Sequence, residues 1–224
     1  MHEKFPFGID GVVLFKSTTD FLKMNNLTEA VFDLITAEDF TKKVKSEPNC
    51  TNEYLRDRLA AYYLNWSKKY PDNVFFKLRR SVIYFQYGDY ETGMQCLKIA
   101  QQKHPNHYLP KLFLAFEYMQ ESNVSKVYEL FGIKDPEKEI TSVKDLFPEV
   151  KEMMDSEYLQ FLFIVTCIYN YKAAYYNDMN RPQQKEEAIK KVYEFASIMT
   201  FIDQKSKITV QIHQYLNSNL NYNL

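Results

Sequence analysis

The side chains that most often carry metal or acid–base chemistry are sparse in this sequence. Among its 224 residues there are four histidines, and two of them, His104 and His107, flank Pro105 in a predicted turn. Two imidazoles at this spacing can share a metal ion, but no cysteine or carboxylate is placed to complete the ligand set. We therefore interpret the turn as a solvated connection and expect neither a metal nor a cofactor.

Nucleophilic chemistry has equally little support. The three cysteines, Cys50, Cys96 and Cys167, are widely separated and form no Cys-x-x-Cys pair, so neither a zinc knuckle nor a disulfide framework is indicated. The sequence has only five glycines and no Gly-x-Ser-x-Gly, His-Glu-x-x-His or phosphate-loop pattern. We predict no catalytic residues, and an enzyme whose site the sequence does not reveal is kept as an alternative.

The charge balance argues against a field that would hold nucleic acid or an anionic membrane. Lys and Arg number 28 and Asp and Glu number 29, which gives a net charge of −1. One local basic cluster, formed by Lys68, Lys69, Lys77, Arg79 and Arg80, is interleaved with aromatic residues. RNA binding through this cluster is a second alternative, although nucleic acid is not the favoured partner.

The beginning of the sequence and its apolar stretches favour an intracellular, reducing location, with the cytoplasm preferred. The first residues lack the apolar stretch of a signal peptide, and the first arginine is Arg56, which disfavours a mitochondrial presequence. The longest apolar stretch, Tyr158 to Tyr169, has about half of the ~20 residues that span a bilayer. We predict that it forms a buried helix, so that any association with a membrane is peripheral.

Helical periodicity dominates the sequence from Thr51 onward and predicts an all-α fold. Apolar residues recur at steps of three and four, and Pro, Gly, Asp and Asn punctuate these runs as they do short turns between antiparallel helices. The preceding residues are less regular. Gly11 to Phe15 is either a short strand or the start of a helix, and Thr36 to Asp39 resembles a capping box before a short helix that ends near Ser46.

An internal repeat runs through the middle of the chain. Pro71 and Pro105 are 34 residues apart, and the same step relates Tyr84 to Tyr118. A period of this length is typical of a repeated helix–turn–helix unit, in which each hairpin buries its apolar side against its neighbours.

The segment from Val74 to Pro105 resembles one tetratricopeptide repeat (TPR). The residues that carry the resemblance are Ser81, Tyr84, Gly88, Asp89, Tyr90, Gly93, Leu97, Ala100 and Pro105. Lys77 and Arg80 depart from the family, which has a large aromatic residue and a leucine there. The resemblance implies a TPR-like α-solenoid, a stack of antiparallel helix hairpins with an extended surface.

We predict five regions along the chain. They are an N-terminal extension with short helices (1–50), TPR-like helical repeats (51–135), a charged connector with one or two short helices (136–155), a C-terminal helical hairpin with a final helix (156–216), and a frayed tail (217–224).

In TPR proteins the first helix of each hairpin lines a concave groove, and here those positions form an apolar stripe that ends in glutamine each time. One interpretation, which we favour because apolar stripes are usually buried, places the stripe in the core. The other leaves a groove that receives a helix, from a partner or from the chain's own C-terminal segment. The candidate partner-binding residues are Phe75, Leu78, Val82, Phe85, Gln86, Leu109, Leu112, Phe116, Met119 and Gln120.

The resemblance also implies a role in protein assembly. Stacked helical hairpins bind other proteins along their extended surface, so we predict a non-catalytic scaffold or adaptor subunit of a larger complex. The expected partners are other protein subunits, with no small-molecule substrate evident. Analogy of fold places such subunits in assemblies at membranes or on the cytoskeleton.

Overall fold

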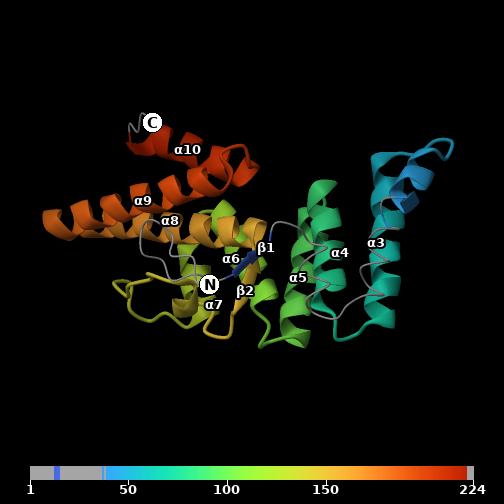
Figure 1. Ribbon diagram of the computed structural model, residues 1–224, viewed down its shortest axis with the longest axis horizontal. Helices are drawn as coiled ribbons and strands as arrows, with labels where there is room; N and C mark the ends of the chain where they lie inside the picture. The colour runs from blue at the N-terminus through green and yellow to red at the C-terminus, as the bar shows by residue number, and fades with distance from the viewer. Residues whose placement is uncertain (1–12, 16–36, 38, 221–224) are drawn as a thin grey trace. The chain divides into compact units, whose positions relative to one another are not determined.

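The computed structural model describes residues 13–15, 37 and 39–220, and the fold of this part of the chain is all-α, as predicted (Figure 1). The described residues form two compact units. The hairpin unit contains residue 37 and residues 39–114, and the C-terminal unit contains 13–15 and 115–220. The division falls within helix α6 (Tyr108–Gln120).

The main part of the hairpin unit consists of helices α3 (Asn52–Lys69), α4 (Val74–Gln86) and α5 (Tyr90–Lys103), which lie side by side in sequence order (Figure 1). Polar side chains start each of them: Thr51, Asn73 and Asp89 accept hydrogen bonds from the first free backbone N–H groups of the helix that follows. These local signals explain why the helices begin where they do.

Aromatic rings fill much of the core of the hairpin unit. The Trp66 ring of α3 packs against Tyr70 and Phe76, with ring centres 6.1 and 6.3 Å apart. Phe40 stacks on Tyr62 at 4.7 Å. Aromatic side chains bury a large apolar area each, so part of the heavy aromatic content of this chain serves the core.

A close approach within the α4–α5 hairpin requires a glycine. The Phe85 ring of α4 lies against Gly93 of α5, and a Cβ atom at Gly93 would come within 2.5 Å of that ring. Glycine therefore lets the two helices pack at this distance.

The period of 34 residues is also visible in the backbone. Helix α6 has the same length as α4, 13 residues, and begins 34 positions later. Each is followed by a left-handed residue, Gly88 with φ 80° and Ser122 with φ 55°. The next backbone N–H then bonds to the carbonyl of Tyr84 at 2.9 Å in the first hairpin and of Tyr118 at 2.8 Å in the second. These two turns therefore close in the same way.

The helices that follow these turns are capped alike. The Asp89 side chain accepts from the third helical N–H of α5 at 3.1 Å, and Asn123 does the same for α7 (Val124–Phe131) at 3.2 Å. An N-cap of this kind contributes about 1 kcal/mol to helix stability.

The C-terminal unit is organised around α8 (Asp155–Asp178). Most of this helix is buried, including the predicted apolar stretch from Tyr158 to Tyr169, so the prediction of a buried helix is confirmed. Helices α9 (Pro182–Asp203) and α10 (Lys207–Leu220) pack against it. Among the described residues, none of the helices combines the length and the apolar character that a membrane crossing needs.

The segment between α7 and α8 differs from the prediction of a charged connector with one or two short helices. It holds one 3₁₀ turn, η1 (Val143–Asp145), and a short strand β2 (Glu152–Met154), which pairs in parallel with β1 (Val13–Phe15). The strand alternative for residues 13–15 is thus the one observed. Seven apolar residues of the segment are buried in the C-terminal unit: Ile133, Ile140, Val143, Leu146, Phe147, Val150 and Met153.

The two ends of the chain are described in part. Residues 39–45 are helical, in agreement with the short helix predicted to end near Ser46, whereas the predicted cap at Thr36 lies outside the described residues. Helix α10 continues to Leu220, through half of the segment predicted to fray, and residues 221–224 lie outside the description.

Candidate functional site

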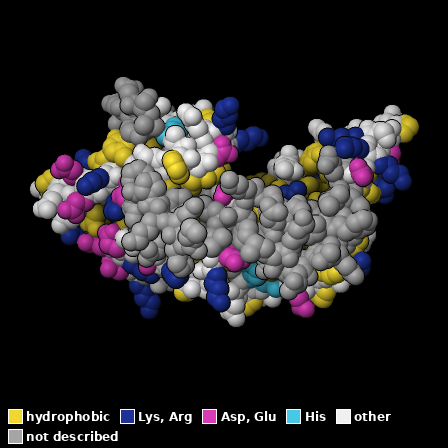
Figure 2. All heavy atoms as spheres, viewed as in Figure 1, with side chains coloured by type: hydrophobic (Ala, Val, Ile, Leu, Met, Phe, Trp, Pro, Cys, Tyr) yellow, Lys and Arg dark blue, Asp and Glu magenta, His cyan; other side chains and the backbone are white. Residues whose placement is uncertain are grey.

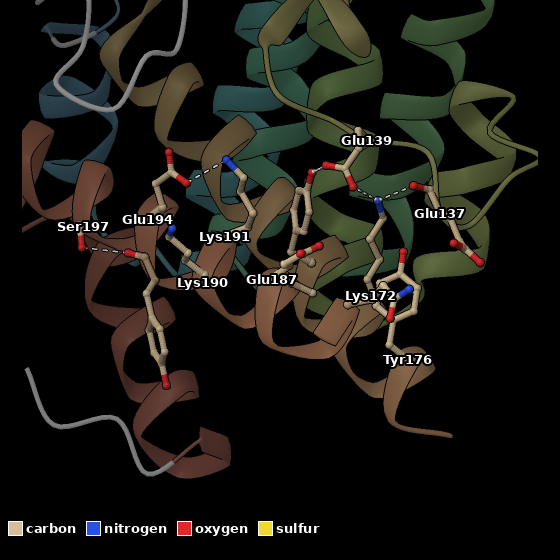
Figure 3. A pocket seen from close by; sticks show the side chains of 13 residues that line it. Glu137, Glu139, Lys172, Tyr176, Glu187, Lys190, Lys191, Glu194 and Ser197 are labelled. Atoms are coloured by element: carbon tan, nitrogen blue, oxygen red, sulfur yellow. Dashed lines mark hydrogen bonds and ion pairs between the residues drawn. The ribbon is translucent and has the colours of Figure 1, made fainter. Parts of the chain in front are cut away.

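A cavity of about 930 Å³ opens in the C-terminal unit on a face shared by α8 and α9 (Figure 3). Three parts of the chain line it: the segment 137–139, the C-terminal half of α8 and one side of α9. Helix α8 contributes Tyr169, Lys172 and Tyr176, whose helical spacing places them on one face.

A buried lysine forms the floor of the cavity. Lys172 is only 1% exposed, and its ammonium donates to the backbone carbonyls of Glu137 at 3.2 Å and Lys138 at 2.5 Å. The Glu139 carboxylate lies 3.8 Å away, and the Tyr169 ring centre lies 4.8 Å from the same nitrogen. Burial lowers the pKa of Lys172 from its ordinary value, and the nearby carboxylates oppose that shift. An ammonium whose donors are engaged in this way is a structural clamp and not a free nucleophile.

Two further contacts hold the same segment against the helix hairpin. The Tyr169 hydroxyl donates to Glu139 at 2.5 Å, and burial together with this bond raises the pKa of the hydroxyl. Arg181, which lies between α8 and α9, pairs with Glu137 at 2.6 Å. Residues 137–139 are therefore fixed by side chains from positions far along the chain.

The rim of the cavity carries charges of both signs. Lys191 pairs with Glu194 at 2.9 Å, while Glu187 and Lys190 are exposed (Figure 3). Figure 2 shows acidic and basic side chains interspersed over this α8–α9 hairpin. A mixed rim produces no strong field of one sign, so the cavity suits contact with a polar protein surface better than concentration of a charged small molecule.

A second feature lies in the hairpin unit, where arginines stack on aromatic rings. The Arg79 guanidinium of α4 lies 5.8 Å from the Tyr63 ring centre of α3 and 5.9 Å from that of Phe75. Arg80 lies 5.8 Å from the Tyr84 ring centre. Cation–π attraction of this kind holds a guanidinium over a ring. We call this surface the arginine–aromatic face; its residues are Arg56, Tyr63, Phe75, Arg79, Arg80 and Tyr84.

The arginines of this face differ in their acidic partners. Arg56, which lies 6.0 Å from the Tyr84 ring centre, also pairs with Asp57 at 2.9 Å and with Asp89 at 3.7 Å. Within the described residues, the side chains of Arg79 and Arg80 have neither an ion pair nor a hydrogen bond, and the Nε of each is buried without an acceptor. A buried donor left in this state costs about 1–3 kcal/mol.

The ten predicted partner-binding residues divide by exposure. The buried ones are Leu78, Leu109, Leu112 and Met119. The others are the half-buried Phe75, Val82, Phe85 and Phe116 and the exposed Gln86 and Gln120. The stripe therefore contributes to the core while leaving aromatic edges and both glutamines at the surface.

At the end of α6 the stripe meets the chain's own C-terminal helices. The Phe116 ring centre lies 5.2 Å from that of Phe163 in α8, and the side-chain amides of Gln120 and Gln211 of α10 hydrogen-bond to each other. Met119 and Gln120 also line a smaller cavity of about 320 Å³ with residues of α8 and α10. One occupant considered from the sequence, the chain's own C-terminal segment, is thus in contact with this part of the stripe.

The two histidines of the turn after α5 have separate local roles. A hydrogen bond of 2.7 Å joins His104 Nε2 to the Lys77 ammonium, and His107 Nδ1 accepts from the backbone N–H of Leu109 at 3.2 Å. His107 thereby caps α6 in the place where Asn73 caps α4. In the part of the chain that the structure describes, no three His, Cys, Asp or Glu side chains gather as metal ligands.

The cysteines are free thiols. Burial raises the pKa of Cys167 to about 12 and also raises that of Cys96. Thiols in this state remain protonated and are poor nucleophiles.

The cluster around Lys172 was missed by the sequence analysis. Its signal is faint, because Tyr169, Lys172 and Tyr176 follow an apolar stretch at helical spacing, but the segment that supplies their partners was interpreted as a solvated connector. The arginine–aromatic face was anticipated in part, as a basic cluster with interleaved aromatic residues.

No family model, curated protein or solved structure matches this chain.

Proposed function

We propose that this chain is a TPR-like, non-catalytic scaffold or adaptor subunit that binds other proteins along its helical hairpins. The observation that carries the proposal is the recurrence of one local geometry at a step of 34 residues. Left-handed residues recur at Gly88 and Ser122, and capping side chains recur at Asp89 and Asn123. Repeated helix hairpins bury the sides that face each other and leave lateral faces free for partners.

Partly covered aromatic residues supply the contact surface in this proposal. Phe75 and Phe85 belong to the predicted stripe and are half-buried, so each is held by packing while part of its ring remains accessible. Rigid aromatic side chains of this kind dominate the energy of many protein interfaces, because they bury a large area at little entropic cost.

Purification of the tagged full chain from its native cells, with quantitative mass spectrometry, tests the proposal. We expect defined subunits in fixed stoichiometry with the chain, and elution well above its own mass of 26.7 kDa. The tag alone, expressed at the same level, is the matched control. Elution of the chain as a lone monomer in native extract would contradict the proposal.

A further inference from the structure

We propose that the arginine–aromatic face binds an acidic segment of a partner protein, whose carboxylates are placed against Arg79 and Arg80. This inference rests on the proposed scaffold function and names the chemistry of one partner.

The guanidinium groups of Arg79 and Arg80 are suited to bind a carboxylate. Each presents five N–H donors in a planar fork that matches a carboxylate. In Arg79 and Arg80 the Nε is buried without an acceptor, whereas the terminal nitrogens also lack acceptors but are not fully buried. The terminal donors are therefore available to an anion that reaches the surface.

Stacking on aromatic rings preorganises both arginine side chains. Arg79 is held between Tyr63 of α3 and Phe75 of α4, and Arg80 is held over Tyr84. Because stacking already limits the side-chain conformations, binding an anion costs less conformational entropy than it does with a free surface lysine.

Charge is distributed unevenly along the chain. Residues 51–114 contain ten Lys and Arg against five Asp and Glu, whereas residues 1–50 contain six against eight and residues 115–224 contain 12 against 16. The net charge of −1 thus conceals a basic region around this face. Nearby Lys77 adds a positive charge to this region, although its ammonium is engaged by the Pro71 carbonyl and His104.

The same contacts favour a protein over RNA. Single-stranded RNA is bound largely by stacking of bases on aromatic rings and by neutralisation of many phosphates. Here the guanidinium groups lie over the rings of Phe75 and Tyr84, which limits the use of these rings by bases. Among the arginines of this face, two are without an anion within the part of the chain that the structure describes, Arg79 and Arg80. A short peptide with a few carboxylates matches this arrangement.

Fluorescence polarisation with the full chain tests the inference. The probe is a fluorescein-labelled decapeptide of glutamate with a central phenylalanine, in about 50 mM NaCl, where screening is weak. We expect binding that Arg79→Gln with Arg80→Gln weakens about tenfold or more, since a charge-assisted hydrogen bond contributes about 1.5–3 kcal/mol. Arg79→Lys with Arg80→Lys keeps the charge but loses the fork, and we expect it to weaken binding several-fold.

The matched control is Lys98→Gln with Lys103→Gln, which removes the same charge from exposed positions of α5. Circular dichroism and thermal unfolding establish that each variant is folded. Three results would each overturn the inference. They are equal weakening by the α5 variant, binding by the lysine variant that is as tight as that of the wild type, and no binding up to about 1 mM peptide. Tighter, arginine-dependent binding of oligouridine of the same length would overturn it in favour of RNA.

Failure of this inference is distinguishable from failure of the scaffold function. If the wild-type chain purifies with its subunits and the Arg79→Gln, Arg80→Gln chain retains all of them, the acidic-segment inference is wrong and the scaffold proposal stands. If the wild-type chain purifies alone, the scaffold proposal itself is wrong.

Discussion

The α4–α5 hairpin and the segment 133–154 are both packed into a core, but different kinds of information place them there. In the hairpin, Asn73, Gly88 and Asp89 lie next to the helix ends that they define. The segment 133–154 has one 3₁₀ turn and one three-residue strand, yet Phe147 is fully buried. Regular elements thus carry local signals in the sequence, whereas the position of an irregular segment depends on residues that are distant in the chain and contact it.

Within 133–154 a strong local signal comes from Asp145. Asp145 accepts hydrogen bonds from the backbone N–H groups of Thr141 and Ser142 at 2.8 and 2.7 Å. Burial alone would raise the pKa of Asp145, but these bonds outweigh it and lower the pKa from its ordinary value. Further constraints come from α8, where Lys172 and Tyr169 hold the segment through Glu139 and its neighbours.

The largest effect should come from the core residue of the irregular segment. Phe147→Ala should lower the free energy of unfolding by about 3–5 kcal/mol, because it empties a fully buried site between Phe131 and Phe161. Chemical denaturation measures the change. Phe201→Ala is the matched control, since Phe201 is 70% exposed and its loss should cost under about 0.5 kcal/mol. A cost for Phe147→Ala as small as that of the control would mean that 133–154 is a connector after all.

The next effect concerns the clamp between that segment and α8. Lys172→Ala should cost about 2–3 kcal/mol, because two backbone carbonyls lose a donor and the buried stem leaves a cavity. Lys172→Met should lower the free energy of unfolding by less, since it keeps most of the apolar part of the side chain.

Denaturation curves for both variants separate the packing contribution from the polar one. Lys190→Ala, at an exposed position on the rim of the same cavity, should change stability by less than about 0.5 kcal/mol. Equal costs for Lys172→Ala and Lys190→Ala would refute the clamp.

A smaller effect tests the hairpin side of the comparison. Gly93→Ala should lower stability by about 1–2 kcal/mol, because the clash with the Phe85 ring exceeds the gain in helix propensity. Combining it with Phe85→Leu should recover much of the loss. Thermal unfolding of the single and double variants measures this coupling, and purely additive effects would show that the contact does not limit the hairpin.

The smallest effect is a gain in stability that depends on pH. Burial, and then the nearby Glu121, raise the pKa of Glu117 in α6 to about 7. Because the folded state holds this proton more tightly than the unfolded state, stability is greatest below the ordinary pKa and falls as pH rises towards 7. Glu117→Gln should therefore stabilise the chain at pH 8 by about 1 kcal/mol, a value discounted for partial exposure, and have no such benefit near pH 4.

Denaturation at both pH values measures the difference for Glu117→Gln. The control is Glu129→Gln on the exposed side of α7, which should change stability by less than about 0.5 kcal/mol at either pH. A gain for Glu117→Gln that is equal at the two pH values would rule out titration of Glu117 as its origin.

The candidate sites were predictable to different degrees. The basic and aromatic composition of the arginine–aromatic face is visible in the sequence. The pairing of Arg56 with Asp89 is not, and neither is the lack of an anion at Arg79 and Arg80 among the described residues. The cluster at Lys172 could not be predicted, because charged residues in a segment with prolines look alike whether they are solvated or engaged by a buried ammonium.

The sequence by itself determined the all-α class, the 34-residue step, the caps and turns of the hairpins and the buried course of α8. Those features depend on residues within a few positions of one another, through helical periodicity and backbone capping. Only the tertiary structure decided that Phe147 is core, that Lys172 is a clamp and that Arg79 has no anion beside it in the described part of the chain. Burial and ion pairing depend on groups that are distant in the chain and adjacent in space, so no local pattern records them.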